Sequence, residues 1–117
     1  MTAIVQDYCP GMTGSAGIEV GVGPGPGPGT VCVCVSGEID FDNAAHLRHA
    51  LLTALVSHRA TLLLDLERMT FCDCAGLNTL LAARHAALNA GRRLRITAAS
   101  RPVWRLLDFT DTRSLFT

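Results

Sequence analysis

From residue 30 onward, strand-like and helix-like apolar patterns alternate, and this alternation limits the possible folds more than any other feature of the sequence. The strand patterns cover residues 30–36, 62–66 and 94–98. The helix patterns cover about residues 44–58, 74–90 and 100–107. Segment 62–66 is apolar without interruption, which is typical of a central strand. Two strand–helix–strand units in succession imply right-handed crossovers and a parallel core.

The first 30 residues have a different composition. They contain eight of the 11 glycines and four of the five prolines, and segment 23–29 alternates the two residue types. Because neither residue supports the interior of a helix or strand, segment 23–29 is predicted to be a loop. Apolar residues alternate over 18–22 and predict one more strand at a sheet edge. Residues 1–17 are expected to be a flexible N-terminal segment, and 18–117 one domain with element order β-β-α-β-α-β-α.

Composition excludes several classes of protein. The 117 residues include ten arginines, no lysine and ten acidic residues, so the net charge of zero gives no case for direct binding to nucleic acid. No apolar run reaches the length of about 18 residues that a membrane span needs, and the N-terminus lacks the pattern of a secretory signal. We therefore expect a cytoplasmic protein whose five cysteines are reduced.

Segment 69–77 carries the densest group of candidate functional residues. It lies where a strand pattern ends and a helix pattern begins, which is where sites gather in α/β sheets. Asp73 is placed to cap the helix, and Gly76 allows backbone or a partner to approach closely. Cys74 is either a small packing residue or a thiol whose reactive thiolate form the helix N-terminus favours.

Other residues have structural explanations beside their functional ones. Glu38, Asp40 and Asp42 could do acid–base chemistry or hold magnesium, but a polar turn with a helix cap at Asp42 or Asn43 explains them as well. The two Cys-X-Cys pairs, 32/34 and 72/74, could supply four thiolates to zinc, but core packing fits their spacing better, so no metal site is predicted. Trp104 is expected to anchor a helix in the core. The remaining candidates are expected on solvated faces, namely His46, His49, His58, His85, Arg92, Arg93 and Arg95.

Two motifs in this order resemble the STAS domain of anti-sigma-factor antagonists. The first is Ser36-Gly37-Glu38-Ile39-Asp40 after a valine-rich strand, and the second is Phe71-Cys72-Asp73-Cys74-Ala75-Gly76-Leu77 after the central strand. The resemblance covers about residues 18–116. It implies a STAS-like mixed sheet of about four strands with a parallel core and helices packed on it. The sequence shows no last strand or helix of the kind the family often adds, which leaves the outer sheet edge undefined.

The resemblance also implies a function. Family members bind an anti-sigma factor, often a serine kinase, and so free a sigma factor for transcription. The kinase phosphorylates a Ser or Thr directly after the motif aspartate, and the phosphorylated form dissociates. In this sequence that position is Cys74, followed by Ala75, and neither side chain has a hydroxyl. We expect an antagonist that this kinase cannot switch off.

The implied partner surface combines the acidic turn with the start of the second long helix. Its residues are Glu38, Asp40, Asp42, Asp73, Cys74, Ala75, Gly76 and Leu77, with Leu77 and Leu81 expected partly in the core and partly at the surface. We expect a monomer or weak dimer with a protein partner, no cofactor and no enzymatic activity. The alternatives are a STAS module that binds a small ligand or joins an assembly, and a redox sensor that depends on Cys74.

Overall fold

The computed structural model describes residues 13–15 and 17–117, with side chains described from residue 17, and these residues form one sheet and four helices. The strands are β1 (Thr13–Ser15), β2 (Ile18–Pro24), β3 (Thr30–Ile39), β4 (Thr61–Cys72) and β5 (Leu94–Ala99). The helices are α1 (Ala44–Ser57), α2 (Cys74–Asn89), α3 (Arg101–Phe109) and α4 (Arg113–Phe116). Residues 1–12 and 16, Cys9 among them, lie outside the described residues, so the flexible N-terminal segment stays a prediction.

The five strands stand in sequence order across the sheet. β1, β2 and β3 pair antiparallel with one another in turn, whereas β3–β4 and β4–β5 are parallel pairs. The predicted α/β fold, a mixed sheet with a parallel core, is confirmed. The strand β1 and the short helix α4 are additions that the apolar patterns did not predict.

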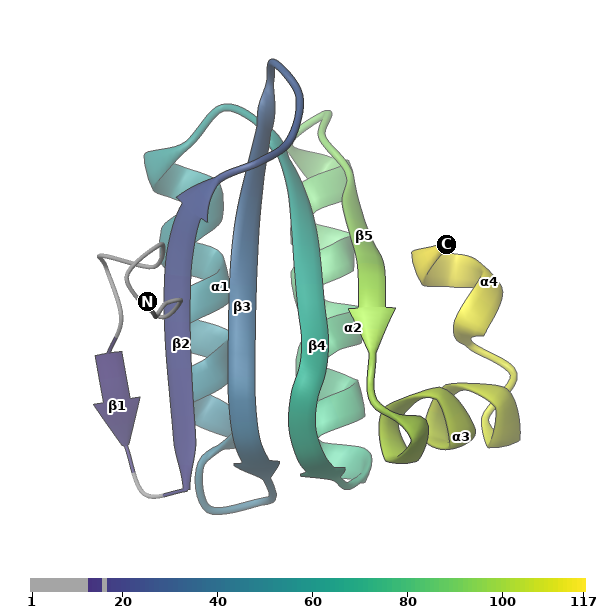
Figure 1. Cartoon of the computed structure of the whole chain (residues 1–117). Coiled ribbons are helices and arrows are strands. Elements are labelled where there is room, and N and C mark those ends of the chain that lie inside the picture. Colours follow the sequence, from purple (N-terminus) through teal and green to yellow (C-terminus); the bar gives the residue numbers. More distant parts are fainter. Residues whose placement is uncertain (1–12, 16) are drawn as a thin grey trace.

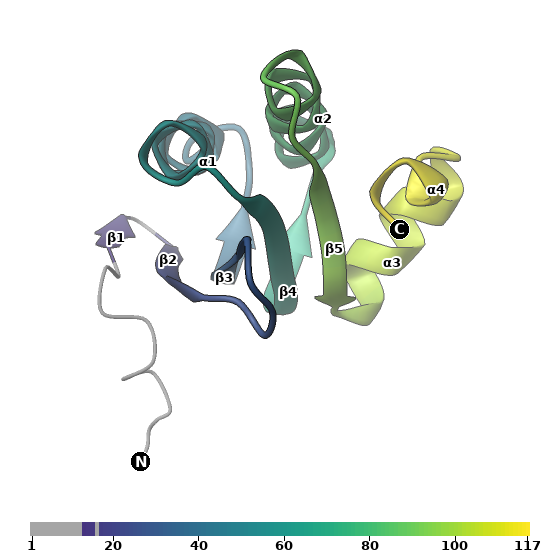
Figure 2. The same cartoon turned by 90° about the horizontal axis from the view of Figure 1, so that it is seen from above.

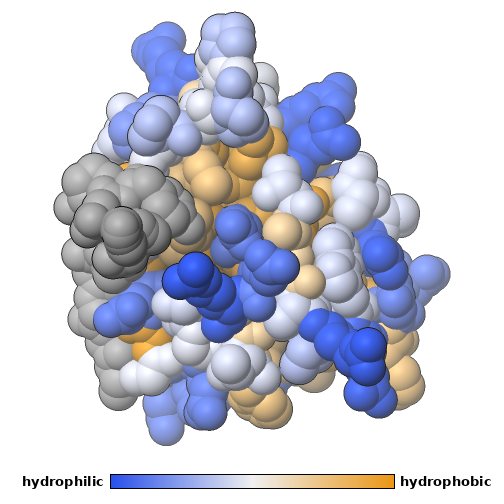
Figure 3. Space-filling view, viewed as in Figure 1, coloured by the Kyte–Doolittle hydropathy of each residue, from blue (hydrophilic) through white to orange (hydrophobic). Residues whose placement is uncertain are grey.

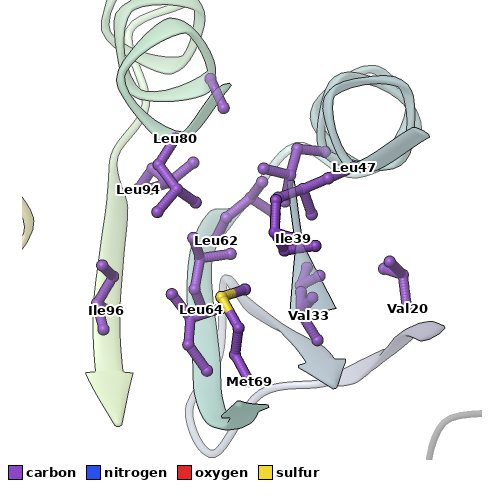
Figure 4. Close-up of a cluster of buried hydrophobic side chains, with 14 of the residues drawn as sticks. Val20, Val33, Ile39, Leu47, Leu62, Leu64, Met69, Leu80, Leu94 and Ile96 are labelled. Carbon is purple, nitrogen blue, oxygen red and sulfur yellow. The ribbon is translucent and has the colours of Figure 1, made fainter. Parts of the chain in front are cut away.

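The helices divide the two faces of the sheet unequally. Helices α1 and α2 lie together on one face, and α3 and α4 lie beside β5 (Figures 1 and 2). The buried core fills the layer between the sheet and α1 and α2. Figure 4 shows this layer, with Val33, Leu62 and Leu64 of the sheet below Leu47 and Leu80 of the helices. All five side chains are at most 1% exposed. None of the helices in the described part of the chain is long and apolar enough to cross a membrane.

β3 and β4 extend further than their apolar patterns predict. The strand patterns in the sequence end at residue 36 and, for the central strand, at residue 66. In the structure the pairing of the two strands continues to Ile39 and Cys72 through irregularities in register. Such bulges accommodate polar residues within a strand and return later apolar side chains to the core. Ile39 and Met69 are accordingly 0% exposed.

The Gly-Pro segment is the tip of a hairpin between β2 and β3. Gly23 and Pro24 still pair with β3, so the loop is shorter than the predicted 23–29. Within it, the Gly25 N–H donates to the Thr30 carbonyl at 3.1 Å, and the Thr30 hydroxyl donates to the Gly27 carbonyl at 2.5 Å. Thr30 therefore supplies the hydrogen bonds that close a turn rich in prolines, which have no N–H of their own.

Helix α4 covers part of the sheet edge that the sequence left undefined. Its Phe116 is 0% exposed. On its outer side, Arg113 stacks on the Trp104 ring of α3 with 4.3 Å to the ring centroid and pairs with Asp108 at 3.0 Å. The expectation of no further element after the third helix was wrong, because a four-residue helix carries too short an apolar pattern to be read from sequence.

Candidate functional site

The parallel pairing of β3 and β4 brings the two predicted motifs to the same edge of the sheet. Glu38 pairs with Phe71 and Ile39 with Cys72. The Asp73 N–H then donates to the Ile39 carbonyl at 3.2 Å. The acidic turn after β3 and the start of α2 are therefore neighbours, at the lower end of the sheet in Figure 1.

Asp40 holds the acidic turn in shape. Its Oδ1 accepts hydrogen bonds from the backbone N–H groups of Asp42, at 2.9 Å, and Asn43, at 3.2 Å. Asn43 occupies the N-cap position of α1 but does not cap it through its side chain. Instead its Oδ1 accepts from the Asp40 N–H at 2.9 Å and its Nδ2 donates to the Glu38 carbonyl at 2.7 Å. The predicted side-chain cap by Asp42 or Asn43 is thus replaced by a closed turn, which leaves Asp42 exposed.

Asp73 caps α2 as predicted. Its Oδ1 accepts from the N–H groups of Ala75, at 2.9 Å, and Gly76, at 3.1 Å. Cys74 is the first residue of the helix and is exposed, while Asp73 and Ala75 are half-buried. The residue after the motif aspartate is therefore presented to solvent at a helix N-terminus, where the partial positive charge of the backbone is concentrated.

Gly76 and Leu77 lie between the first turn of α2 and the sheet, and they do not form the surface of the site. A Cβ on Gly76 would lie 2.6 Å from the Cys72 Sγ and 2.7 Å from the Ile39 Cγ2, so α2 sits too close to the sheet for a side chain here. Leu77 is 5% exposed and belongs to the core. The expectation that Leu77 is partly at the surface was wrong, because the first turn of α2 lies directly on the ends of β3 and β4. Leu81 is half-buried, as expected.

The carboxylates of this edge are not neutralised by the arginines of the described chain. The ion pair between Arg113 and Asp108 is the one salt bridge found among the described residues, and it lies on α3 and α4. Glu38, Asp40, Asp42 and Asp73 thus form an edge of negative charge. Such an edge favours a positively charged partner surface.

Two exposed aromatic residues flank these carboxylates and were not singled out from the sequence. Phe41, between Asp40 and Asp42, is 83% exposed, and Phe71, which pairs with Glu38, is 48% exposed. A lone phenylalanine in a polar turn was the available signal for Phe41. Exposed aromatic side chains next to charges are common anchors of protein interfaces.

Burial separates the two cysteines of this corner. Cys72 is 8% exposed. Burial, together with the nearby charges of Asp73 and Cys74, raises the pKa of the Cys72 thiol from 9.0 to about 12. Cys72 is therefore a neutral packing residue, whereas the Cys74 thiol is accessible.

This pKa shift predicts a loss of stability at alkaline pH. The unfolded chain releases the Cys72 proton near pH 9, whereas the folded chain holds it to about pH 12. The contribution of the buried Cys72 thiol to the free energy of unfolding is complete below pH 9 and falls as the pH rises from 9 to 12. The denaturant midpoint should therefore drop between pH 8 and pH 11, and this drop should be larger for the wild type than for Cys72→Ala. Equal differences in the two proteins would contradict the burial of a neutral thiol.

The other candidate residues do not join this site. The two Cys-X-Cys pairs lie at different positions along the strands, and no group of three or more His, Cys, Asp or Glu side chains suited to a metal ion occurs in the described part of the chain. His49, His58 and His85 are exposed and His46 is half-buried. Arg92 differs from the expected solvated residue, since it donates to the carbonyls of Leu55 and His58 and so fixes the end of α1.

The fold and the two motifs define a STAS domain. A family model described as "Mlab, STAS domain" matches residues 27–115, and the chain belongs to this family. No curated protein matches the sequence.

Solved structures with the same fold include anti-sigma factor antagonists. One from Mycobacterium paratuberculosis is 25% identical, with a TM-score of 0.73 over 89% of this chain and 86% of that chain. The unphosphorylated form of the anti-sigma factor antagonist SpoIIAA is 19% identical, with a TM-score of 0.68 over 84% of this chain and 85% of that one. The phosphorylated form of SpoIIAA, described as a Bacillus cell fate determinant, is 18% identical, with a TM-score of 0.62 over 84% of this chain and 88% of that one. The chain therefore has an antagonist-like fold.

Proposed function

We propose that this protein is an anti-sigma-factor antagonist that binds a serine-kinase-type anti-sigma factor and so frees a sigma factor for transcription. In this role the chain binds its protein partner in the cytoplasm and catalyses no reaction itself. The observation that carries the proposal is the exposed first residue of α2, held by the Asp73 cap beside the acidic turn of β3. The fold shared with the mycobacterial antagonist at 25% identity supports it.

The proposed contact surface is the acidic edge, formed by Glu38, Asp40, Asp42, Asp73, Cys74 and Ala75, together with Phe41 and Phe71. Gly76 and Leu77 support it from the core. The carboxylates would steer a partner surface rich in arginine or lysine, and the two phenylalanines would fill apolar depressions in it. This arrangement of apolar anchors with charged surroundings is typical of protein interfaces.

Cys74 sets this protein apart from antagonists that a kinase can switch off. A phosphate at this position would add about −1.5 to −2 charges beside Asp73, which a tightly packed and already acidic contact would not tolerate. A thiol at the same position accepts no phosphate from a serine kinase. We therefore propose that the partner kinase cannot release this protein, and that its abundance or thiol oxidation regulates it instead.

Affinity capture from the source cells tests this function. The wild-type protein should retain an ATP-binding kinase of the anti-sigma-factor class. Cys74→Glu places one negative charge at the centre of the contact and should weaken capture at least about tenfold, equivalent to about 1.4 kcal/mol. Retained proteins are identified and quantified by mass spectrometry.

His85→Glu is the matched control for this experiment. His85 is exposed on the same helix, about 16 Å along the axis from Cys74. This variant should retain as much kinase as the wild type. If neither wild type nor control retains a protein of this class, the antagonist function is wrong, and a ligand-binding or assembly role becomes the better explanation.

A further inference from the structure

A groove between β2 and α1 lies outside the proposed contact surface. It has a volume of about 270 Å³ and lies on the helix-covered side of the sheet, where α1 passes over β2 (Figure 2). The opposite face of the sheet, shown in Figure 3, carries hydrophilic side chains across its apolar surface. None of the residues that line the groove belongs to the acidic edge. The groove is therefore a second candidate site on this chain.

The floor of the groove is apolar. Val20 and Val22 of β2 line it together with Ala50 and Ala54 of α1. Val20 and Ala54 belong to the buried core, whereas Val22 and Ala50 are half-buried. The two alanines lie one helical turn apart, and their small side chains leave room between the helix and the strand. A concave, apolar surface of this kind favours the apolar part of a small ligand.

His46 brings an unsatisfied polar atom to this groove. Its side chain lines the groove, and its Nε2 is buried without a hydrogen-bond partner among the described residues. Native proteins usually pair buried polar atoms with protein, water or ligand, because an unpaired one is destabilising. Rotation about the Cβ–Cγ bond, a broad torsion in histidine, would turn Nε2 toward the groove. His46 is therefore the residue placed to contact the polar group of a ligand.

The charges around His46 favour an anionic group at this end of the groove. His46 lies in the first turn of α1, where the partial positive charge of the helix is concentrated. His49 and His58 also line the groove, and none of the described lining residues is acidic. We infer that the groove binds a small apolar acid, with its carboxylate at His46 and its apolar body along β2 and α1.

The size of the groove limits the length of this acid. Pockets for drug-sized ligands have volumes of about 300 to 1,000 Å³, so a groove of about 270 Å³ takes a smaller molecule. From His46 to Ala54, α1 rises about 12 Å. This length suits a medium-chain carboxylic acid such as octanoate.

Calorimetric titration of the full-length protein with octanoate tests the site. The wild type should bind about one octanoate per chain. Octanol, which has the same chain without the charge, should bind at least about tenfold more weakly, although a purely apolar groove would prefer it.

Two substitutions in the groove separate the apolar contact from the polar one. Ala50→Leu fills the groove and should weaken the binding of octanoate at least about tenfold. His46→Leu should weaken octanoate by a similar factor and leave the binding of octanol unchanged, a difference that a merely structural role of His46 would not produce. Far-ultraviolet circular dichroism checks that both variants are folded.

His85→Leu is the matched control, because His85 is exposed on α2 and does not line the groove. It should bind octanoate as tightly as the wild type. Absence of saturable octanoate binding, or equal affinity of the wild type and Ala50→Leu, would overturn the site. Octanol binding as tightly as octanoate would show that the ligand is not an acid. These outcomes are independent of whether the protein captures an anti-sigma factor.

Discussion

With serine in place of Cys74, the protein is expected to accept about one phosphate from the partner kinase, whereas the wild type accepts none at this position. The Asp73 cap presents residue 74 to solvent at the start of α2, so a serine hydroxyl there would be reachable. Intact mass after incubation with the captured kinase, Mg²⁺ and ATP measures the phosphate. The modified Cys74→Ser protein should then lose affinity for the kinase, because the added charge lies within the acidic edge.

Ala75→Ser is the control for position, since it moves the hydroxyl one residue along the helix to a half-buried place. It should accept much less phosphate than Cys74→Ser. The nearby threonines are poor substitutes for residue 74. The Thr79 hydroxyl is buried and donates to the Ala75 carbonyl at 3.1 Å, and the Thr70 hydroxyl donates to the Gly37 carbonyl at 3.3 Å. Phosphorylation of the wild type at any residue, with loss of binding, would contradict the proposal that the kinase cannot switch this protein off.

Gly37→Ala is expected to be the most destabilising small substitution among the glycines of the sheet. Gly37 has φ of +103°, and a Cβ there would lie 2.0 Å from the Gly17 carbonyl oxygen. That oxygen accepts the Glu38 N–H at 2.7 Å, so a side chain would push β2 away from β3 at this point. Backbone strain and the steric clash together should cost about 3 kcal/mol or more, measured by urea unfolding.

Substitutions at two other glycines separate the effect of backbone strain on stability from the effect of the steric clash. Gly29 has φ of +74° with no atom within 4 Å of a Cβ, so Gly29→Ala should show the cost of backbone strain alone, about 1 kcal/mol. Gly27 has the same open space without the unusual φ, and Gly27→Ala should change stability by less than about 0.5 kcal/mol. A Gly37→Ala stability equal to that of Gly27→Ala would show that β2 and β3 are not in close contact at Gly17.

Local patterns predicted most of the architecture of this chain. Alternation at Val31, Val33 and Val35 and the apolar run at 62–66 correspond to β3 and β4, two of the three parallel strands. The spacing between Asp73 and Gly76 predicted the cap and the close packing of α2. These features could be predicted because each follows from neighbours within a few residues.

Features that depend on tertiary contacts could not be predicted in the same way. The extension of β3 to Ile39 depends on bulges in its pairing with β4, and the burial of Leu77 depends on the position of α2 above both strands. Asn43 stabilises the acidic turn through the Glu38 carbonyl, five residues earlier, and does not cap its own helix. Phe71 lies in a strand and is nevertheless 48% exposed, which depends on how β4 is placed in the folded sheet.

Release of a sigma factor tests the proposed function most directly. A labelled sigma factor is bound to the captured anti-sigma factor, and its fluorescence anisotropy is followed while the wild-type protein is added. The wild type should release the sigma factor at about one chain per anti-sigma factor, and Cys74→Glu should need at least about tenfold more protein. Failure of the wild type to release it, or equal release by both proteins, would contradict antagonism through the acidic edge.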